Sequence, residues 1–436
     1  MPSRGSTNQD EVHKDFSLLP FLKSFTCEGM SQKRLAIVLS GGGARGAYEA
    51  GVIHYIRTML PAHVRERHFD IQCGSSIGAI NSCFMTAMAH DPEAQGKEIR
   101  HLWERVREED VYRRDPQALL GFLSKTGRGV VTNLFMGARR SNHFHGFLDT
   151  SPLLPFLERI IPWQMISKNI ANGLVKALSI VATNVFTGKM ELFIEKQPQI
   201  EYTGEYLTHM TQVTALHVMA SCAIPVVFPS VLVDGVAYID GGLRLNTPMS
   251  PAIQLGADSI LIIGLHHKLA RGEHLPEHGE KGVQPPLGQI VGRVMNSIFL
   301  DRTQYDIEQL ERINRIVDWS IKLYGDRYLE DLNHMLQREN IRGDIADRGL
   351  KRITALRMLP SEDIAELFNR YYQMRRRTRL TTFERVMMRI LDIDPAGSTD
   401  FLSYISFRPD YLKALLDLGF EDARTHHDKL VSFLEQ

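Results

Sequence analysis

Cysteine is scarce in this sequence, and its scarcity bears on the compartment in which the protein works. Only four cysteines occur among 436 residues, and they are scattered without metal-ligand spacing: Cys27, Cys73, Cys83 and Cys222. Disulfide frameworks belong to small secreted domains, whereas few, scattered cysteines are typical of reducing compartments. We therefore expect a reduced, cytoplasmic protein.

Long hydrophobic runs and an excess of charge are also missing. No stretch of about eighteen uncharged apolar residues occurs, so no membrane-spanning helix is expected, and the start of the chain holds no apolar export signal. The 51 basic residues equal the 51 acidic ones, which gives no support for nucleic-acid binding or for attraction of the whole molecule to anionic membranes. No EF-hand pattern or metal cluster is present, so neither a metal nor a cofactor is expected.

The sequence does contain enough apolar material for a large core. Apolar residues make up 43% of the chain, an ordinary share for a globular protein. A length of 436 residues allows one large domain with a smaller one, or one elaborated core. Residues 1–32 lack periodicity and are expected to form a flexible leader.

The pattern after this leader predicts alternating strands and helices. An apolar run at 35–39 enters a glycine loop, and apolar residues from Tyr48 to Met59 recur at helical spacing. A second short strand at 69–73 is followed by a second apolar helical stripe, from Ile77 to Met88. Because strand, loop and helix alternate twice, we expect an α/β fold with a mostly parallel central sheet.

The rest of the chain is divided by its pattern. Residues 93–162 are helical and irregular, as expected of a cap inserted over an active site, and 266–286 are polar enough to be a linker or surface loop. A mainly helical carboxy-terminal region, 287–436, contains one predicted strand at 353–359, which would return it to the sheet. A long helix is expected at 287–313, and Ser361 is expected to cap another. Further strands are predicted at 177–183, 190–194 and 259–264.

Three motifs carry the chemistry. Residues 40–46 form a glycine loop that can bring backbone N–H groups close to a negative oxygen. Ser76 lies between Gly74 and Gly78 in a G-x-S-x-G elbow, where larger side chains would collide in a sharp strand-to-helix turn. Asp240 follows a short apolar strand and precedes a tight turn. Together they predict an acyl hydrolase whose serine is served by an aspartate, since the motifs supply a nucleophile, a base and oxyanion donors.

The glycine loop has another interpretation, as a dinucleotide-binding loop. Gly41, Gly43 and Gly46 match the G-x-G-x-x-G string, but that string alone is a weak signal. No Lys-Ser or Lys-Thr follows, which excludes a Walker loop. In a dinucleotide-binding unit the next strand should end with an acidic residue, whereas here it ends in the serine elbow. An oxyanion hole is therefore favoured.

The three motifs, in this order, resemble those of the patatin-like phospholipases. Residues 220–225 and 246–248 resemble the family as well, and the similarity covers roughly residues 34–265. Ser40 stands where many members carry Asp, although Ser also occurs there. The resemblance implies a three-layer sandwich with an acyl hydrolase domain at 33–265, followed by a helical carboxy-terminal extension.

The resemblance also implies a role for each motif residue. Ser76 would be the nucleophile and Asp240 its general base, and the amides of Gly42 and Gly43 would hold the oxyanion. Motif support would come from Gly41, Arg45, Gly46, Gly74, Gly78, Gly241 and Gly242. The activity would be that of a phospholipase A or lysophospholipase-like serine esterase, with a phospholipid or other lipid acyl ester as substrate and transient, peripheral membrane contact. Oligomeric state, headgroup and acyl preference stay open.

Several alternatives remain beside this interpretation. His266 or His267 could complete a Ser-His-Asp triad, since both follow a strand after the acid. The same site could serve a lipid transacylase or thioesterase, or the fold could belong to a non-catalytic lipid-binding regulatory protein. Retention of the serine and aspartate together speaks against the last of these. Arg45 could hold the loop, pair within the fold or meet a lipid phosphate.

Two weaker features could contact lipid. A basic run could touch anionic headgroups, although a solvated helix face is the simpler explanation: Arg375, Arg376, Arg377 and Arg379. Apolar residues of the cap could line an acyl channel, although core packing is the default: Phe135, Met136, Phe144 and Phe147.

Overall fold

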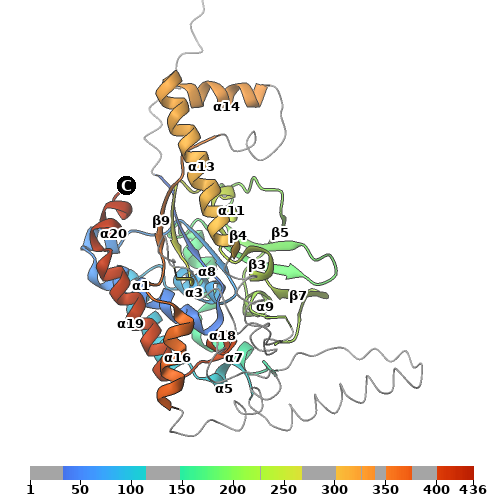
Figure 1. Cartoon of the computed structure of the whole chain (residues 1–436). Coiled ribbons are helices and arrows are strands. Elements are labelled where there is room, and N and C mark those ends of the chain that lie inside the picture. Colours follow the sequence, from blue (N-terminus) through green and yellow to red (C-terminus); the bar gives the residue numbers. More distant parts are fainter. Residues whose placement is uncertain are drawn as a thin grey trace, which may run out of the picture. The chain divides into compact units, whose positions relative to one another are not determined.

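The central feature of the fold is a nine-stranded sheet, seen in a computed structural model of the chain (Figure 1). The structure describes residues 33–113, 148–225, 227–267, 301–325, 327–338, 350–375 and 400–436. The sheet and the helices on it belong to one compact unit, Arg34–Gln436. The leader, the four cap residues from Phe135 to Phe147, and Arg376, Arg377 and Arg379 lie outside the described residues.

The strands follow the order β5-β4-β3-β2-β1-β8-β9, with a hairpin of β6 and β7 set against β3. Most neighbours are parallel, namely β1 with β2 and β8, β2 with β3, β4 with β5, and β8 with β9; β3 pairs antiparallel with both β4 and β7. This confirms the expected α/β fold with a mostly parallel sheet. The strands are β1 (Leu35–Leu39), β2 (Ile71–Ser75), β3 (Ala177–Asn184), β4 (Met190–Lys196), β5 (Leu207–Met210), β6 (Val231–Val233), β7 (Val236–Asp240), β8 (Ser259–Ile263) and β9 (Thr354–Met358).

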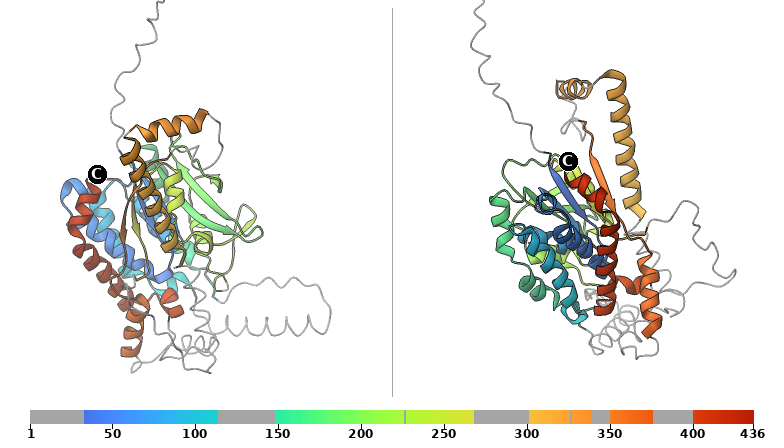
Figure 2. Two further views of the ribbon diagram at one scale, coloured as in Figure 1. Left: turned by 45° about the horizontal axis from the view of Figure 1, so that its top comes forward. Right: turned by 90° about the vertical axis from the view of Figure 1, so that its left-hand side faces the viewer.

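Helices cover both faces of the sheet and make it the middle of three layers. Along β1 alternate side chains enter different cores, because successive residues of a strand point to opposite faces. Leu35, Ile37 and Leu39 pack on the side of α1, α3 and α4, whereas Ala36 and Val38 pack on the side of α11 and α13. Figure 2 shows the blue helices and the gold α13 on opposite sides of the strands.

The helices and short helical turns have the following bounds. On the first face and around the site are η1 (Gly43–Gly46), α1 (Ala47–Met59), α2 (Ala62–Arg65), α3 (Ile77–Ala87), α4 (Pro92–Arg105), α5 (Glu108–Val111), α7 (Leu153–Ile160), α8 (Trp163–Ala171), α9 (Ala215–Ser221) and α10 (Gly242–Leu245). The others are α11 (Met249–Gln254), α13 (Asp301–Tyr324), α14 (Tyr328–Arg338), α16 (Ile364–Arg375), α18 (Asp400–Ile405), α19 (Pro409–Thr425) and α20 (His427–Leu434).

The carboxy-terminal region joins the core at two places. The strand predicted at 353–359 is confirmed as β9, which extends the sheet beyond β8. Helix α19 packs on α1 where Gly51 and Gly419 let the two backbones approach. A Cβ atom on Gly51 would lie 2.1 Å from the carbonyl oxygen of Leu416, and one on Gly419 would lie 2.1 Å from that of Tyr48. Only glycine fits at this crossing.

Three element boundaries differ from the prediction. The second strand begins two residues later than expected, at Ile71. Helix α13 continues past residue 313 to Tyr324, because the buried Val317 prolongs its apolar face. Ser361 is not the cap of α16, which begins at Ile364: Asp363 Oδ1 accepts the N–H groups of Ala365 at 2.7 Å and Glu366 at 3.3 Å. A carboxylate one residue before the helix satisfies these free donors, and Ser361 is too far upstream to do so.

Candidate active site

The serine elbow joins β2 to α3. Ser76 has φ 53° and ψ −124°, a left-handed conformation that is uncommon for a residue with a side chain. A Cβ on Gly74 would lie 2.3 Å from the carbonyl oxygen of Gly78, and one on Gly78 would lie 2.3 Å from that of Leu39. The two glycines are therefore required by the sharpness of the turn, as the spacing predicts.

The structure brings Ser76 and Asp240 together although they lie far apart in the sequence. Ser76 Oγ donates a hydrogen bond to Asp240 Oδ2 at 2.6 Å, and both residues are buried. The other carboxylate oxygen, Oδ1, accepts the N–H of Gly242 at 2.7 Å. The register of β7 on β3, which places Asp240 opposite Ala182, carries the carboxylate to the serine.

The glycine turn after Asp240 allows close packing on β3. A Cβ atom on Gly241 would lie 2.2 Å from the carbonyl oxygen of Val181. The carboxylate of Asp240 is therefore held against the sheet by its own strand, by this contact and by the N–H of Gly242. It can meet the serine hydroxyl without a large rearrangement.

Burial sets the acidity of Asp240. Loss of hydration raises its pKa to about 7, while the hydrogen bonds from Ser76 and from the Gly242 amide oppose part of this rise. The carboxyl group therefore changes its charge near neutral pH, where a general base is most useful.

The glycine loop lies against the serine. A Cβ on Gly41 would lie 3.0 Å from Ser76 Cβ, and Gly43 has φ 57°, in the left-handed region. Asn246 fixes Gly41 by two hydrogen bonds. The backbone carbonyl of Asn246 accepts the N–H of Gly41 at 3.0 Å, and Asn246 Nδ2 donates to the carbonyl of Gly41 at 3.1 Å. Within the part of the chain that the structure describes, the amides of Gly42 and Gly43 donate to no protein acceptor.

Arg45 is buried rather than presented to solvent. Its guanidinium donates from Nε and Nη2 to Ser403 Oγ, at 3.0 and 2.6 Å, and lies 3.8 Å over the ring of Tyr404. A Cβ atom on Gly43 would lie 2.1 Å from the carbonyl oxygen of Tyr404. Helix α18 thus holds the glycine loop from outside, which favours the loop-holding role for Arg45 over contact with a lipid phosphate.

A buried polar network supports the loop from below, and the sequence interpretation missed it. Glu49 accepts the Ser40 N–H at 2.7 Å and the Asn81 Nδ2 at 2.8 Å, and Trp103 Nε1 donates to Asn81 at 2.9 Å. Burial raises the pKa of Glu49 well above its usual range, and the two hydrogen bonds oppose this shift. An acidic residue among apolar neighbours on a predicted buried helix is the signal that would have found it.

Ser221 is a second residue that the motifs do not reveal. Its Oγ, at the end of α9, accepts the backbone N–H of Ser76 at 2.8 Å. The amide of Ser76 is therefore occupied by the protein, in contrast to those of Gly42 and Gly43. This bond ties the residues around 220–225, which resemble the patatin-like family, to the elbow.

His267 is placed differently from the histidine of a triad. The Oγ of Ser76 meets the carboxylate directly at 2.6 Å, which leaves no room for an imidazole between them. The ring of His267 makes its own hydrogen bond, from Nδ1 to the carbonyl oxygen of Pro360 at 3.0 Å. This geometry favours a serine-aspartate pair over the triad alternative.

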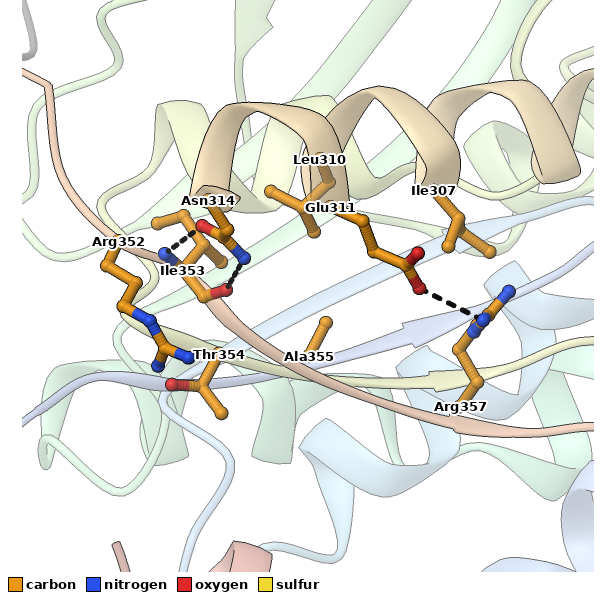
Figure 3. Close-up of a pocket in the computed structure, with 9 residues that line it drawn as sticks. All are labelled: Ile307, Leu310, Glu311, Asn314, Arg352, Ile353, Thr354, Ala355 and Arg357. Carbon is orange, nitrogen blue, oxygen red and sulfur yellow. Dashed lines mark hydrogen bonds and ion pairs between the residues drawn. The ribbon is translucent and has the colours of Figure 1, made fainter. Parts of the chain in front are cut away.

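A small cavity lies elsewhere, between α13 and β9 (Figure 3). Asn314 Nδ2 donates to the carbonyl of Ile353, and Asn314 Oδ1 accepts the N–H of the same residue. Arg357 pairs with Glu311 at 3.1 Å. Neither Ser76 nor Asp240 lines it. These contacts attach α13 to the edge strand, so we interpret the cavity as a packing feature.

A family model and a curated phospholipase match this chain. Residues 37–253 match the family model described as patatin-like phospholipase. The cGAMP-activated phospholipase of Pseudomonas aeruginosa (strain BWHPSA011 / Pa011) is 28% identical over 219 residues, which cover 49% of this chain and 53% of that protein. The matched region therefore spans about half the length of this curated relative.

Solved structures are similar at low sequence identity. VipD from Legionella pneumophila is 16% identical with a TM-score of 0.29, over 88% of this chain and 67% of VipD. Human GIVD cytosolic phospholipase A2 is 11% identical with a TM-score of 0.35, over 92% of this chain and 59% of that chain. A chain of the ExoU–SpcU complex of Pseudomonas aeruginosa is 14% identical with a TM-score of 0.26, over 89% of this chain and 75% of that chain.

Proposed function

We propose, from the premise that this chain belongs to the patatin-like phospholipase family through residues 37–253, that it is a serine esterase of the phospholipase A or lysophospholipase type. The observation that carries the proposal is the 2.6 Å hydrogen bond from Ser76 Oγ to Asp240 Oδ2. A hydroxyl held on a strained elbow and bonded to a buried carboxylate is the arrangement that a nucleophile and its base require.

In the proposed mechanism, Ser76 Oγ attacks the carbonyl carbon of a lipid ester as its proton passes to Asp240. The tetrahedral intermediate then collapses, the alcohol leaves with the proton from Asp240, and the acyl group stays on Ser76. Water, deprotonated by Asp240, attacks this acyl-enzyme; the bond to Ser76 Oγ then breaks, Asp240 returns the proton to that oxygen, and the fatty acid is released. The pKa of about 7 lets one carboxyl group accept and return the proton near neutral pH.

Gly42 and Gly43 are the proposed oxyanion donors. Their loop lies beside Ser76, through the contact between Gly41 and the serine Cβ. Within the described residues their amides have no other acceptor, whereas the amide of Ser76 is taken by Ser221. Two backbone donors that are fixed before the reaction stabilise developing negative charge without reorganisation.

Covalent labelling tests the proposal most directly. A fluorophosphonate probe should modify the protein, and peptide mass spectrometry should place the adduct on Ser76. Ser76→Ala protein should take up no label, whereas Ser432→Ala, on the exposed face of α20, should be labelled like the parent. An adduct on another serine, or full labelling of Ser76→Ala, would assign the chemistry elsewhere.

The fate of the acyl group separates hydrolysis from acyl transfer. We expect release of free fatty acid from phospholipid vesicles when water is the only acceptor. Added alcohol or thiol acceptors should not divert most of the product. If they do, the same site would belong to a transacylase. If an acyl thioester substrate is hydrolysed faster than the phospholipid, the site would belong to a thioesterase.

A further inference from the structure

We infer that the turn after β3, together with the β6–β7 hairpin, is the surface through which this protein docks on a lipid bilayer. This surface, the Phe186 corner, consists of Val185, Phe186 and Leu232 with the basic residues Lys189 and Arg244. The inference rests on the proposed function for its choice of a lipid surface, and its test is designed to fail separately from that function.

The apolar side chains of the Phe186 corner are exposed. Phe186 is 82% accessible, Leu232 63% and Val185 42%. Val185 donates its N–H to Ala237, and Ala237 is the register partner of Leu232. Strand β7 therefore lies between Val185 and Leu232, and Phe186 follows Val185 in the turn after β3. Large apolar side chains exposed in one region are characteristic of surfaces that meet a membrane or a partner.

A rigid turn presents Phe186 to solvent. Asn184 Oδ1 accepts the N–H groups of Phe186 at 2.9 Å and Thr187 at 3.1 Å, and its carbonyl accepts that of Gly188 at 2.9 Å. Asn184 also donates its own N–H to the carbonyl of Lys189 at 2.9 Å. These bonds fix the backbone of the turn without using the Phe186 side chain, which therefore has no role in holding the turn.

The charge near these apolar residues suits phospholipid headgroups. Lys189 is exposed at the end of the turn, and the guanidinium of Arg244 lies 3.5 Å from where a Cβ of Gly188 would be. Asp234, at the far turn of the hairpin, is the acidic residue nearest in sequence to Leu232. Apolar side chains beside cations match an interface whose phosphates surround an apolar interior.

The Phe186 corner is also continuous with the proposed active site. Asp240 ends β7 and pairs with Ala182, four residues before Phe186 in a strand that runs toward the corner. At the rise of a β-strand this separation is roughly 13 Å. The corner and the serine elbow both lie at the carboxyl end of parallel strands, where ligands of open α/β sheets bind. A lipid held at the corner is therefore near Ser76.

Vesicle binding with a matched control tests this inference. Phe186→Ser, made in the Ser76→Ala background so that vesicles stay intact, should bind vesicles of equal parts phosphatidylcholine and phosphatidylglycerol about tenfold more weakly. Leu323→Ser, which changes a residue that is 75% exposed on α13, should bind like the Ser76→Ala protein. Phe186→Leu should retain most of the binding.

The basic residues have their own measurement. Lys189→Gln should weaken binding to the same mixed vesicles about fivefold and leave binding to pure phosphatidylcholine unchanged. Lys322→Gln, an exposed lysine of α13, is the control and should change neither. In protein with an intact Ser76, Phe186→Ser should slow vesicle hydrolysis while a soluble short-chain ester is cleaved at the parent rate.

Two results would overturn the inference. One is equal vesicle binding by Phe186→Ser and Leu323→Ser. The other is self-association of the parent, measured by sedimentation, that Phe186→Ser abolishes without changing vesicle binding, because the corner would then join two copies of the chain. Absence of ester hydrolysis in the parent would refute the proposed function alone, since the binding comparison needs no turnover.

Discussion

At the scale of single residues, the site combines strain, burial and one short hydrogen bond. Ser76 is held at a positive φ between glycines, and Asp240 is buried with both carboxylate oxygens bonded. The positive φ and the burial of the carboxyl group each cost stability. Together with the hydrogen bond they place a hydroxyl and a carboxyl group of near-neutral pKa in direct contact, from which three predictions follow at this scale.

Ser76→Ala should lower ester hydrolysis by at least about a thousandfold, because the covalent nucleophile is lost. The fold should stay intact, since the turn depends on Gly74 and Gly78 rather than on the hydroxyl. Steady-state rates with a soluble ester and a thermal melt of the same protein check both statements. Well-folded variant protein with substantial activity would contradict the assignment.

Asp240→Asn should be nearly as damaging, whereas His267→Ala should change the rate little. Asparagine keeps the shape of the side chain but cannot take the serine proton. His267 contacts the carbonyl of Pro360 rather than the dyad. Comparison of kcat/KM for the two variants decides between dyad and triad. A larger loss of kcat/KM in His267→Ala than in Asp240→Asn would favour the triad.

The pH dependence should follow Asp240. Burial raises the pKa of this carboxyl to about 7, so it is protonated and unable to act as a base below that pH. We expect kcat/KM for a soluble ester to rise with pH through about 7 and then level off. A profile from about pH 5 to about pH 9 that is already flat on its acid side would show that another group is the base.

At the scale of elements, a helix from the end of the chain supports the glycine loop near its start. Arg45 in η1 reaches Ser403 and Tyr404 in α18, and Glu49 in α1 reaches Ser40 and Asn81. Both contacts restrain the loop whose amides are the proposed oxyanion donors, and such donors act best when they are fixed before the reaction. Their loss should therefore affect turnover more than substrate binding.

Ser403→Ala should lower kcat about tenfold with little change in KM, because Arg45 loses both hydrogen bonds to Ser403 and the loop is less well positioned. A stability loss of about 1–3 kcal/mol should accompany it, since a buried cation loses an acceptor. Ser403→Thr, which keeps the hydroxyl, should recover kcat. A purely structural role would give the stability loss with an unchanged kcat.

Gly419→Ala tests the crossing of α1 and α19. Alanine favours a helix by about 1 kcal/mol over glycine, but its Cβ would lie 2.1 Å from the carbonyl oxygen of Tyr48. We expect net destabilisation of about 1–3 kcal/mol in chemical denaturation. Lys413→Ala, on the exposed side of α19, should stay within about 0.5 kcal/mol of the parent. A stabilised Gly419→Ala protein would mean that the helices do not cross this closely.

At the scale of the whole molecule, the sequence predicts a hydrolase domain at 33–265 and a separate carboxy-terminal region. This division depends on sequence similarity, and truncation of the chain tests it. Helix α19 covers apolar residues of α1, and β9 covers the edge of β8. In the described part of the chain no helix is both long and apolar enough to cross a bilayer.

Chains truncated after residue 265 should fail to give a cooperative folding transition, because the apolar face of α1 and the edge of β8 would be open to water. Removal of residues 1–32 should leave the thermal midpoint and the rate of soluble-ester hydrolysis unchanged, since the compact unit begins at Arg34. A stable, active chain that ends at 265 would show that the acyl hydrolase domain folds without the carboxy-terminal region.

The sequence by itself determined the local features of this protein. A continuous apolar run predicts β1, helical spacing predicts α1 and α3, and glycines around Ser76 predict a sharp turn, because each depends on neighbours within a few residues. The order of the three motifs indicated that Ser76 and Asp240 would meet, and the structure brings them to 2.6 Å. One local prediction, the cap of α16, is wrong, because Asp363 rather than Ser361 accepts the free N–H groups at the start of this helix.

Only the tertiary structure decided which distant residues share a contact. Arg45 and Ser403 are 358 positions apart, and no periodicity links them. The buried Glu49 network, the approach of Gly51 to α19 and the exposure of Phe186 likewise depend on the path of the whole chain. Local pattern determines which side of an element is apolar, but the partner that covers it is selected by the packing of all elements at once. The meeting of Ser76 and Asp240 could therefore be predicted from short motifs, whereas the residues that support them and the proposed docking surface could not.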